Sequence, residues 1–534
     1  MSSNRIYLYD TTLRDGVQTL GVDFSVADKR AIAEELDRLG IDYIEGGWPG
    51  ANDTDDAFFA DPPPLRHARF TAFGMTRRSG RSAANDPGLA TLLQARCEAV
   101  CLVGKSWDFQ VDVALGIPRE ENLALIRDSV AAVCAHKEEA LFDAEHFFDG
   151  YKANPAYALA CLLAAAEAGA RWIVLCDTNG GTLPDELTRI VEAVMAHIPG
   201  ERLGIHCHND TETAVASSLA AVRAGVRMVQ GTLNGLGERC GNANLITLIP
   251  NLILKMGLET GVTPEGLRGL TPISREFEER MNRTPNRHAP YVGESAFAHK
   301  GGLHASAVEK NPACYEHIDP EQVGNRRHIV VSNQSGRANL LARFKDLGLE
   351  VESTDPRVTG LLELIKQREF AGYTYDGAEA SLELLARRHL GSVPHYFEIL
   401  RFSARDERRY NAMGHLVTES EASIKIRIGK DEIHTVAEGV GPVHALDNAL
   451  RKALHPTYEA LRHIRLSDFR VRILNSGSGS AAMPRVLIET TDPNQDSWRT
   501  IGVSTNIIDA ALDALSDSFT YTLLRQGIPA PPGT

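Results

Sequence analysis

Residues 172–210 read WIVLCDTNGGTLPDELTRIVEAVMAHIPGERLGIHCHND, and this stretch decides the fold class. It opens with the apolar, strand-like run Trp172–Cys176 and continues through Pro184–His197, where apolar residues recur at helical spacing. A second strand-like run follows at Leu203–Cys207. A strand, a helix and another strand in this order form a βαβ unit with parallel strands. The stretch therefore predicts an α/β protein.

The same alternation runs through the first half of the chain, with helix-length segments such as Val26–Leu39 and Ala214–Ala224 between the strands. Eight units within about 250 residues predict a (β/α)8 TIM barrel over residues 1–270, and a doubly wound open sheet is the alternative. Polar clusters directly after several strands favour the barrel, because active sites of such barrels lie at the carboxyl ends of the strands. The predicted strands are Ile6–Tyr9, Tyr43–Gly47, Phe70–Met75, Ala99–Gly104, Ala140–Glu145, Trp172–Cys176, Leu203–Cys207 and Met228–Thr232.

Length and composition exclude several classes of protein. A chain of 534 residues exceeds what one hydrophobic core usually serves, so two or three domains are expected. The net charge of −14 argues against a nucleic-acid or membrane-surface binder, which would favour a basic face. We expect no signal peptide and no transmembrane helix. The eight cysteines form no C-x-x-C pair, which fits a reducing, cytoplasmic location.

Beyond residue 270 the alternation of strands and helices stops. Residues 271–404 are predicted to form a mainly helical connector, and residues 405–534 a C-terminal α+β domain. Within that domain Glu421–Leu454 and Arg485–Phe519 share one pattern of strand, turn, strand, loop and helix. The shared pattern predicts a pseudo-symmetric domain with an internal binding seam, and two unrelated strand–helix pairs are the alternative.

His206 and His208 are candidate ligands of a divalent metal. Alternate residues of a strand face the same side, so both imidazoles can point into the barrel mouth while Cys207 faces away. Asp15 follows the first strand. In a closed barrel only the eighth strand lies between the first and the seventh strands, so Asp15 can reach the same metal. Two histidines and one carboxylate leave positions open for a chelating substrate such as a 2-oxo acid. The alternative to a metal site is that the histidines only form hydrogen bonds and that Asp10, Arg14 and Asp15 belong to an ion-paired loop.

Four further side chains follow predicted strands. Arg14 would place a cation where a keto oxygen becomes an alkoxide. Glu145 is a candidate base, because the neighbouring aromatics Phe142 and Phe147 are expected to desolvate its carboxylate partly, and its neighbour His146 is expected to face outward. Thr178 offers a hydroxyl to a carboxylate or simply caps the next helix. Asn242, in a loop rich in glycine, contacts the metal or its water, unless the loop is a plain turn.

Three motifs in this order resemble the 2-isopropylmalate, homocitrate and citramalate synthase family: DTTLRDG (Asp10–Gly16), HCHND (His206–Asp210) and GERCGN (Gly237–Asn242). The resemblance implies a divalent ion (Zn, Mn or Mg) held by Asp15, His206 and His208, with Asn242 close by. It also implies that Arg14 polarises the keto group, Thr178 holds the keto-acid carboxylate and Glu145 is the base. Within and after HKGGLHAS, His304 and Tyr315 match residues that reach the active site, commonly from a partner subunit, and activate the hydrolytic water.

The resemblance further implies a reaction between acetyl-CoA and a 2-keto acid. Longer strings such as VGKSWDFQVDVALG (Val103–Gly116) and AEHFFDGYKANP (Ala144–Pro155) are similar to the citramalate synthase branch, which makes pyruvate the expected acceptor and isoleucine the expected effector. Asp143 departs from that branch, where some members carry a bulky aromatic. The alternative acceptors are those of 2-isopropylmalate and homocitrate synthases. A homodimer is expected, with neither nucleic acid nor membrane as a partner.

The sequence argues against three other functions. A lyase of the same barrel group would use a cysteine in the loop after the eighth strand, where this chain has Cys240, but the surrounding GERCGN pattern is that of synthases. In non-haem iron oxygenases the histidine and carboxylate usually lie close together in sequence, and here they do not. An inactive amino-acid sensor would not need the set of Arg14, Asp15, Glu145 and the two histidines.

Overall fold

The computed structural model describes residues 4–531 except 282, 284, 300–301, 330–343, 345–354, 376, 411, 475–481 and 495. The chain divides into two compact units. The first runs to Phe297 and includes His317–Arg327, and the second comprises Ala298–Glu316 and the chain from His328 onward.

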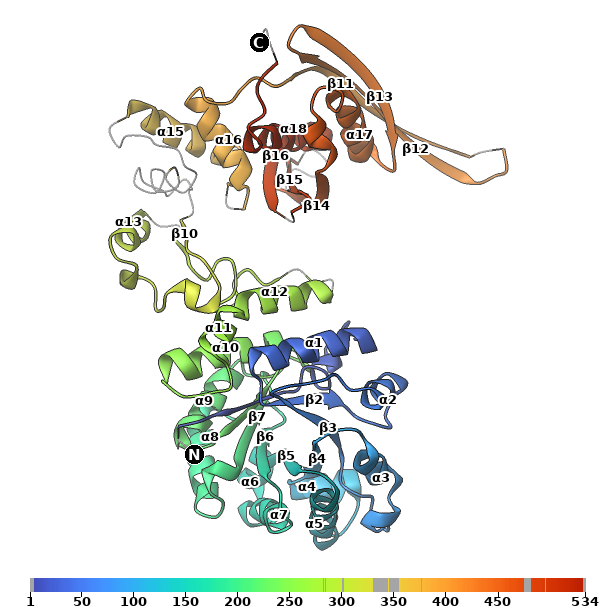
Figure 1. Cartoon of the computed structure of the whole chain (residues 1–534), viewed down its shortest axis with the longest axis vertical. Coiled ribbons are helices and arrows are strands. Elements are labelled where there is room, and N and C mark those ends of the chain that lie inside the picture. Colours follow the sequence, from blue (N-terminus) through green and yellow to red (C-terminus); the bar gives the residue numbers. More distant parts are fainter. Residues whose placement is uncertain are drawn as a thin grey trace. The chain divides into compact units, whose positions relative to one another are not determined.

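The first unit contains a closed barrel of eight parallel strands, which confirms the predicted TIM barrel (Figure 1). Strands β1 and β8 pair in parallel and close it, with Tyr7 opposite Met228 and Asp10 opposite Gly231. The open doubly wound sheet is thereby excluded. The strands are β1 (Tyr7–Asp10), β2 (Tyr43–Gly47), β3 (Arg69–Met75), β4 (Ala99–Lys105), β5 (Glu139–Glu145), β6 (Trp172–Asp177), β7 (Leu203–Cys207) and β8 (Met228–Gly231).

Side chains alternate between two cores along each strand, as the pleat of a strand requires. One core fills the barrel and includes Tyr9, Tyr43, Leu141 and Trp172. The other lies between strands and helices and includes Cys207. Inside the barrel the Trp172 indole N–H donates to the Tyr43 hydroxyl at 3.0 Å, so its polar atom is satisfied. The filled barrel interior leaves only the ends of the strands open for a site.

Helices surround the barrel strands (Figure 1). Helix α1 shows how the sequence defines them: Ser25 and Asp28 form a capping box at its start, and Gly40 ends it with φ +100°. The barrel helices are α1 (Val26–Leu39), α2 (Asp53–Ala60), α3 (Pro87–Gln94), α4 (Asp108–Gln110), α5 (Arg119–His136), α6 (Phe147–Ala153), α7 (Pro155–Glu167), α8 (Pro184–Met195), α9 (Ala214–Ala224) and α10 (Leu245–Pro250).

The segment after the barrel is mainly helical in the residues that are described. Its helices are α11 (Pro264–Arg268), α12 (Leu270–Arg280), α13 (Gly302–Lys310), α15 (Pro356–Phe370) and α16 (Glu379–His389). Two short parallel strands, β9 (Ala298–His299) and β10 (His328–Ile329), pair with each other.

The C-terminal part contains two antiparallel sheets of three strands, each followed by a helix. The first comprises β11 (Glu398–Tyr410), β12 (Leu416–Ile428) and β13 (Asp431–Gly439), followed by α17 (Pro442–Leu454). The second comprises β14 (Arg465–Ile473), β15 (Pro484–Thr491) and β16 (Ser497–Val503), followed by α18 (Ile507–Arg525). Both helices contribute to one hydrophobic core, which includes Leu450 and Phe519. The sequence repeat therefore corresponds to a structural repeat of an α+β domain.

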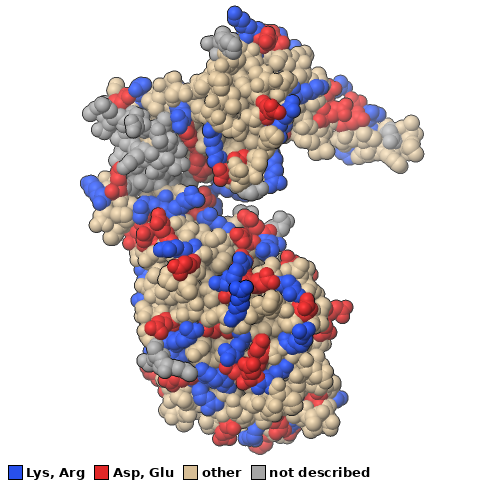
Figure 2. All heavy atoms as spheres, in the orientation of Figure 1, with Lys and Arg blue, Asp and Glu red and all other residues tan. Residues whose placement is uncertain are grey.

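Charged side chains of both signs are interspersed on the visible face of the molecule (Figure 2). Many form ion pairs across the strands of the C-terminal sheets, such as Arg409 with Glu419 at 3.1 Å and Arg427 with Glu398 at 2.8 Å. None of the helices in the described residues has the length and apolar character needed to span a membrane.

Candidate active site

Six of the candidate residues line one cavity of about 270 Å3 at the carboxyl ends of the barrel strands: Arg14, Asp15, Glu145, Thr178, His206 and His208. We call this cavity the inner chamber. The six residues come from β5 and β7 and from the loops after β1, β6 and β7, so residues more than 190 positions apart in sequence meet there because the barrel closes.

Asp15, His206 and His208 are grouped as metal ligands would be. One potential ligand atom from each lies within 4.8 Å of the other two, and all three residues are buried. The Nε2 atoms of the two histidines are 3.4 Å apart, and His206 Nε2 is 3.3 Å from Asp15 Oδ2. Two imidazole nitrogen atoms at this distance form only a weak hydrogen bond with each other, but both can bind one cation.

The protonation states fit a metal site as well. Burial, followed by the charge of His206, lowers the pKa of His208 to about 3, which leaves its imidazole neutral. Burial acts to raise the pKa of Asp15, but the charges of Arg14 and His206 outweigh it and lower that pKa below its ordinary value. An ionised carboxylate and a neutral imidazole are the forms that bind metal.

Asn242 completes this side of the chamber. Its Nδ2 donates to Asp15 Oδ2 at 2.8 Å. Its Oδ1 and the Nδ1 of His208 are buried and have no hydrogen-bond partner among the described residues. Gly237 allows the loop to pass so close, because a Cβ there would lie 2.9 Å from the Asn242 side chain. Unpaired buried polar atoms beside a convergent set of ligands are what a site for a bound ion and its water would contain.

Behind His206 lies a buried hydrogen-bond relay that the sequence did not reveal. His206 Nδ1 is 2.8 Å from Gln230 Oε1, and Gln230 Nε2 donates to Asp143 Oδ1 at 3.0 Å. Because the amide oxygen can only accept, the proton of His206 resides on Nδ1 and its Nε2 faces the ligand group. Burial raises the pKa of Asp143, although the charges of His206 and Arg14 oppose that rise.

Arg14 is held rigidly over the chamber. Its Nε donates to Glu45 Oε2 at 2.7 Å, its Nη1 pairs with Asp15 Oδ1 at 3.0 Å, and its guanidinium lies 3.9 Å from the ring centroid of Phe73. Burial opposes the charged form, but Asp15 and Glu45 raise the pKa of Arg14 and keep it cationic. Glu45, fully buried in the middle of β2, was not predicted, although it begins the polar cluster EGGWPG.

Glu145 lines the inner chamber in an ionic environment rather than the aromatic one expected. Phe142 and Phe147 both belong to the core between strands and helices, and strand alternation puts Phe142 on the opposite face of β5. The carboxylate of Glu145 pairs instead with Lys105, Nζ to Oε2 at 2.5 Å. The idea that aromatic neighbours desolvate Glu145 is therefore wrong.

Thr178 does not cap the following helix, because α8 begins only at Pro184. Its Oγ1 accepts a hydrogen bond from the backbone N–H of His146 at 2.8 Å. The hydroxyl proton of Thr178 is thus left to donate into the chamber. His146 itself has φ +56° at the start of α6, so the alternation of side chains along β5 ends at Glu145. The imidazole Nδ1 of His146 lies 3.5 Å from Asp149 Oδ2.

The loops that carry two of the sequence motifs are joined by Arg239. Its guanidinium pairs with Asp210 at 2.8 Å and donates to the backbone oxygen of Thr178 at 2.8 Å. Cys240 beside it is exposed. This contact ties the loop after β8 to the loops after β6 and β7.

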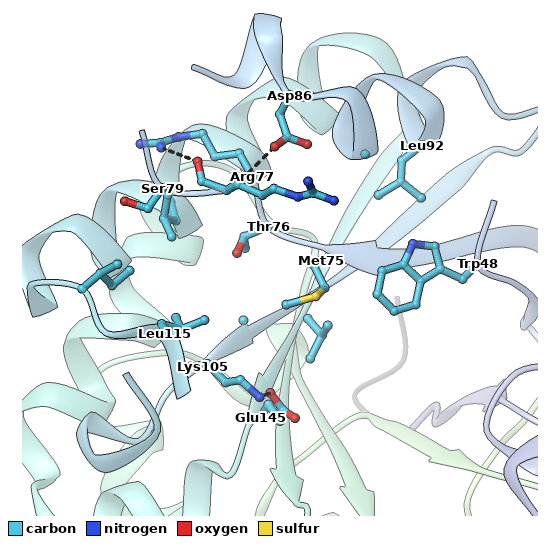
Figure 3. A pocket seen from close by; sticks show the side chains of 16 residues that line it. Trp48, Met75, Thr76, Arg77, Ser79, Asp86, Leu92, Lys105, Leu115 and Glu145 are labelled. Atoms are coloured by element: carbon cyan, nitrogen blue, oxygen red, sulfur yellow. Dashed lines mark hydrogen bonds and ion pairs between the residues drawn. The ribbon is translucent and has the colours of Figure 1, made fainter. Parts of the chain in front are cut away.

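A second cavity, which we call the side chamber, adjoins the inner chamber (Figure 3). The two share Trp48, Met75, Val103, Lys105 and Glu145 as lining residues. The other walls of the side chamber are largely apolar and include Leu92, Leu115, Ile117 and Leu125. Arg78 also lines the chamber, and Arg77 lies across it from Lys105 and Glu145. Glu145 is therefore accessible from both cavities.

His304 and Tyr315 belong to the second unit. Their rings stack on each other with centroids 4.1 Å apart at an angle of 28°, and both side chains are exposed. Lys300 and Gly301 of the HKGGLHAS motif lie outside the described residues.

Comparison with known proteins agrees with this architecture. Residues 5–270 match the family model described as HMGL-like, so the barrel is that of an HMGL-like enzyme, a metal-dependent class. Residues 291–369 match the homocitrate synthase post-HMGL domain-like model, and residues 376–523 match the LeuA allosteric (dimerisation) domain.

Full-length relatives narrow the class. The chain is 51% identical over 520 residues to an (R)-citramalate synthase of Geobacter sulfurreducens, covering 97% of each chain. It is 49% identical over 525 residues to an (R)-citramalate synthase of Aquifex aeolicus, covering 98% of each. A probable 2-isopropylmalate synthase of Methanopyrus kandleri is 31% identical over 512 residues, covering 96% of this chain and 97% of that one. The chain belongs to the family of the (R)-citramalate synthases.

Proposed function

We propose that the protein condenses acetyl-CoA with pyruvate and hydrolyses the thioester, which gives (R)-citramalate and CoA as a step of isoleucine biosynthesis. The observation that carries the proposal is the convergence of Asp15, His206 and His208 with Arg14 and Glu145 around one chamber. The names of the full-length relatives support the same reaction.

Asp15, His206 and His208 would hold a divalent ion, with Zn, Mn and Mg as candidates, and Asn242 lies beside them. When bound, the ion would polarise the carbonyl of a chelated 2-oxo acid. The neutral His208, the ionised Asp15 and the two unpaired buried atoms next to them fit this role.

Three side chains would act on the substrates directly. The guanidinium of Arg14, fixed by Glu45 and Asp15, faces the oxygen that becomes an alkoxide and stabilises its charge. The hydroxyl of Thr178 donates to the keto-acid carboxylate. Glu145 removes a methyl proton from acetyl-CoA, because its carboxylate is accessible from both chambers.

The side chamber is the proposed site of acetyl-CoA. Its apolar walls suit the pantetheine arm, and a thioester entering along them meets Glu145 at the shared wall. Arg78 is exposed at this chamber and would contact a phosphate of the coenzyme. Water then cleaves the thioester after condensation, and His304 and Tyr315 are proposed to activate that water.

The proposal includes three regions: a catalytic barrel over residues 1–270, a connector over 271–404 and a regulatory domain over 405–534. The three family matches support three regions, but the third match begins at residue 376, and β11 (Glu398–Tyr410) spans the proposed boundary at 404/405. Isoleucine is the proposed effector of the regulatory domain, and a homodimer is the proposed assembly, since the matching model describes an allosteric dimerisation domain. A cytoplasmic location is proposed because all eight cysteines are free.

Release of CoA, followed with a thiol reagent, tests the proposal. The purified protein with a divalent ion, acetyl-CoA and pyruvate should release CoA, and omission of pyruvate or addition of a chelator should stop the release. CoA release that does not depend on pyruvate would contradict the proposed reaction. So would the absence of CoA release with every 2-keto acid.

A further inference from the structure

The ion pair between Lys105 and Glu145 lies at the boundary of the two chambers. Lys105 ends β4 and Glu145 ends β5, and the two are direct partners in the parallel register. Their charged groups are 2.5 Å apart, and the side chains are only 18% and 25% exposed. Figure 3 shows them reaching toward each other below Met75. A pair this enclosed is not an ordinary surface salt bridge.

The strand ends that carry this pair are fixed. The backbone N–H and the hydroxyl of Ser106 donate to the backbone oxygen of Glu145 at 3.2 and 2.7 Å. The side-chain amide of Asn122 donates to the backbone oxygen of Lys105 at 2.9 Å. The backbone from which both side chains extend is thus fixed before any substrate arrives, and the ion pair with Glu145 holds the ammonium group at the shared wall, as electrostatic stabilisation of a transition state requires.

Lys105 differs from the other cations around the chambers. Arg14 is bound by Asp15 and Glu45, and Arg77 by Asp128 and Glu121. Among the arginines and lysines that line either chamber in the described residues, Lys105 alone lines both. It is therefore the cation placed beside both the base and the site where the thioester enters.

We propose that Lys105 is a catalytic residue that stabilises the enolate oxygen of the acetyl thioester. The inference rests on the proposed function of Glu145 as the base. A methyl carbon that faces Glu145 is bonded to the carbonyl carbon of the thioester, so the carbonyl oxygen lies two bonds from the reacting atom. A side chain that touches the carboxylate of the base is within reach of that oxygen.

The charges balance through the step. The Glu145 carboxylate accepts a methyl proton and becomes neutral, and the C–H electron pair forms the C=C bond of the enolate. The π pair of the thioester carbonyl moves to its oxygen, where it meets the N–H of the Lys105 ammonium group as a hydrogen-bond donor. The ammonium group of Lys105 thus loses the carboxylate of Glu145 as its anionic partner and gains the enolate oxygen. When the enolate carbon bonds to the keto carbon, the oxygen pair reforms the carbonyl and the keto oxygen takes the charge beside Arg14.

Three substitutions separate this role from a structural one. Lys105→Met removes the charge at similar length, Lys105→Arg keeps a cation, and Lys105→Gln keeps an N–H donor for Glu145 without a charge. Lys152→Met is the matched control, since Lys152 of α6 pairs with Asp149 of the same helix and with Glu186 of α8, and lines neither chamber. Each variant is assayed as the metal-loaded full chain, with melting temperature and metal content measured in parallel.

Lys105→Met and Lys105→Gln should lower kcat by about 10² to 10³, the usual loss for one oxyanion donor, with KM for pyruvate and metal content little changed. Lys105→Arg should retain more activity than either. The isotope effect on kcat/KM with trideuterated acetyl-CoA should rise in Lys105→Met, because proton removal becomes slower relative to later steps.

Activity of Lys105→Gln equal to that of the unsubstituted protein, or an unchanged isotope effect, would overturn the inference and leave Lys105 as a group that only positions Glu145. If Lys105→Met does not fold, the comparison of the Arg and Gln variants decides the question. Failure of the unsubstituted protein to release CoA contradicts the proposed function itself, so the two failures are distinguishable.

Discussion

Substitution of Gln230 by leucine should weaken metal binding, although Gln230 is not a ligand. The amide oxygen accepts from His206 Nδ1 at 2.8 Å and the amide nitrogen donates to Asp143 at 3.0 Å, all in the buried interior of the barrel. Leucine has similar size but forms neither bond. The imidazole of His206 then loses the partner that fixes its tautomer and its orientation toward Asp15 and His208.

The size of the effect follows from this geometry. Loss of a partner that orients a histidine ligand usually lowers metal affinity by roughly 10- to 100-fold, or about 1.4 to 2.8 kcal/mol. The metal-free protein should also be less stable by about 1–3 kcal/mol, because a buried N–H of His206 is left without an acceptor.

Metal affinity is measured by competition with a chromogenic chelator, and stability by denaturant unfolding of the metal-free protein. Cys207→Ala is the matched control: it alters a residue between the two histidines, but one that belongs to the core outside the barrel. Unchanged metal affinity in Gln230→Leu would refute the reasoning that the relay orients His206, as would an equal loss in Cys207→Ala.

Two further predictions concern the same site, and a third concerns the regulatory domain. Glu145→Gln keeps the shape of the side chain but cannot accept a proton, so kcat should fall by roughly 10² to 10⁴ with metal content unchanged. A variant that retains most of its activity would show that Glu145 is not the base. His206→Ala and His208→Ala should each abolish metal retention together with turnover, and retention of metal by both on a metal analysis would contradict the site. Isoleucine should slow hydrogen exchange in residues 398–531 of the intact protein, and protection confined to the barrel would place the effector site elsewhere.

The barrel was predictable because its strands carry strong local signals. The strand Tyr43–Gly47 was predicted with the bounds that the structure has, and the first strand differs by one residue. Strand β14 carried a detectable signal, the alternating run FRVRI (Phe469–Ile473), that was overlooked. Strand β11 was missed because most of its side chains are charged or exposed, as in ARDERRY. A pattern-based prediction has no buried face to detect in such strands.

The candidate site was predictable where topology alone brings residues together. Glu145 and His206 lie at the carboxyl ends of barrel strands and Asp15 lies in the loop after β1, so closure of the barrel places them at one end. Glu45, Lys105 and Gln230 were not found, because their importance lies in pairings across strands that depend on register and side-chain direction. Lys105 ends an ordinary apolar strand, AVCLVGK, and only its partner Glu145 distinguishes it.

The choice of keto acid tests the central claim most directly. Pyruvate presents a methyl group and 2-oxoisovalerate an isopropyl group, and a chamber packed around a methyl excludes the larger group sterically. A chamber built for isopropyl would still admit pyruvate, with a loss of about 1–3 kcal/mol per missing methylene. We therefore predict that kcat/KM, measured by CoA release, is high for pyruvate and barely detectable for 2-oxoisovalerate. An equal or higher kcat/KM for 2-oxoisovalerate would contradict the proposed reaction and indicate a 2-isopropylmalate synthase.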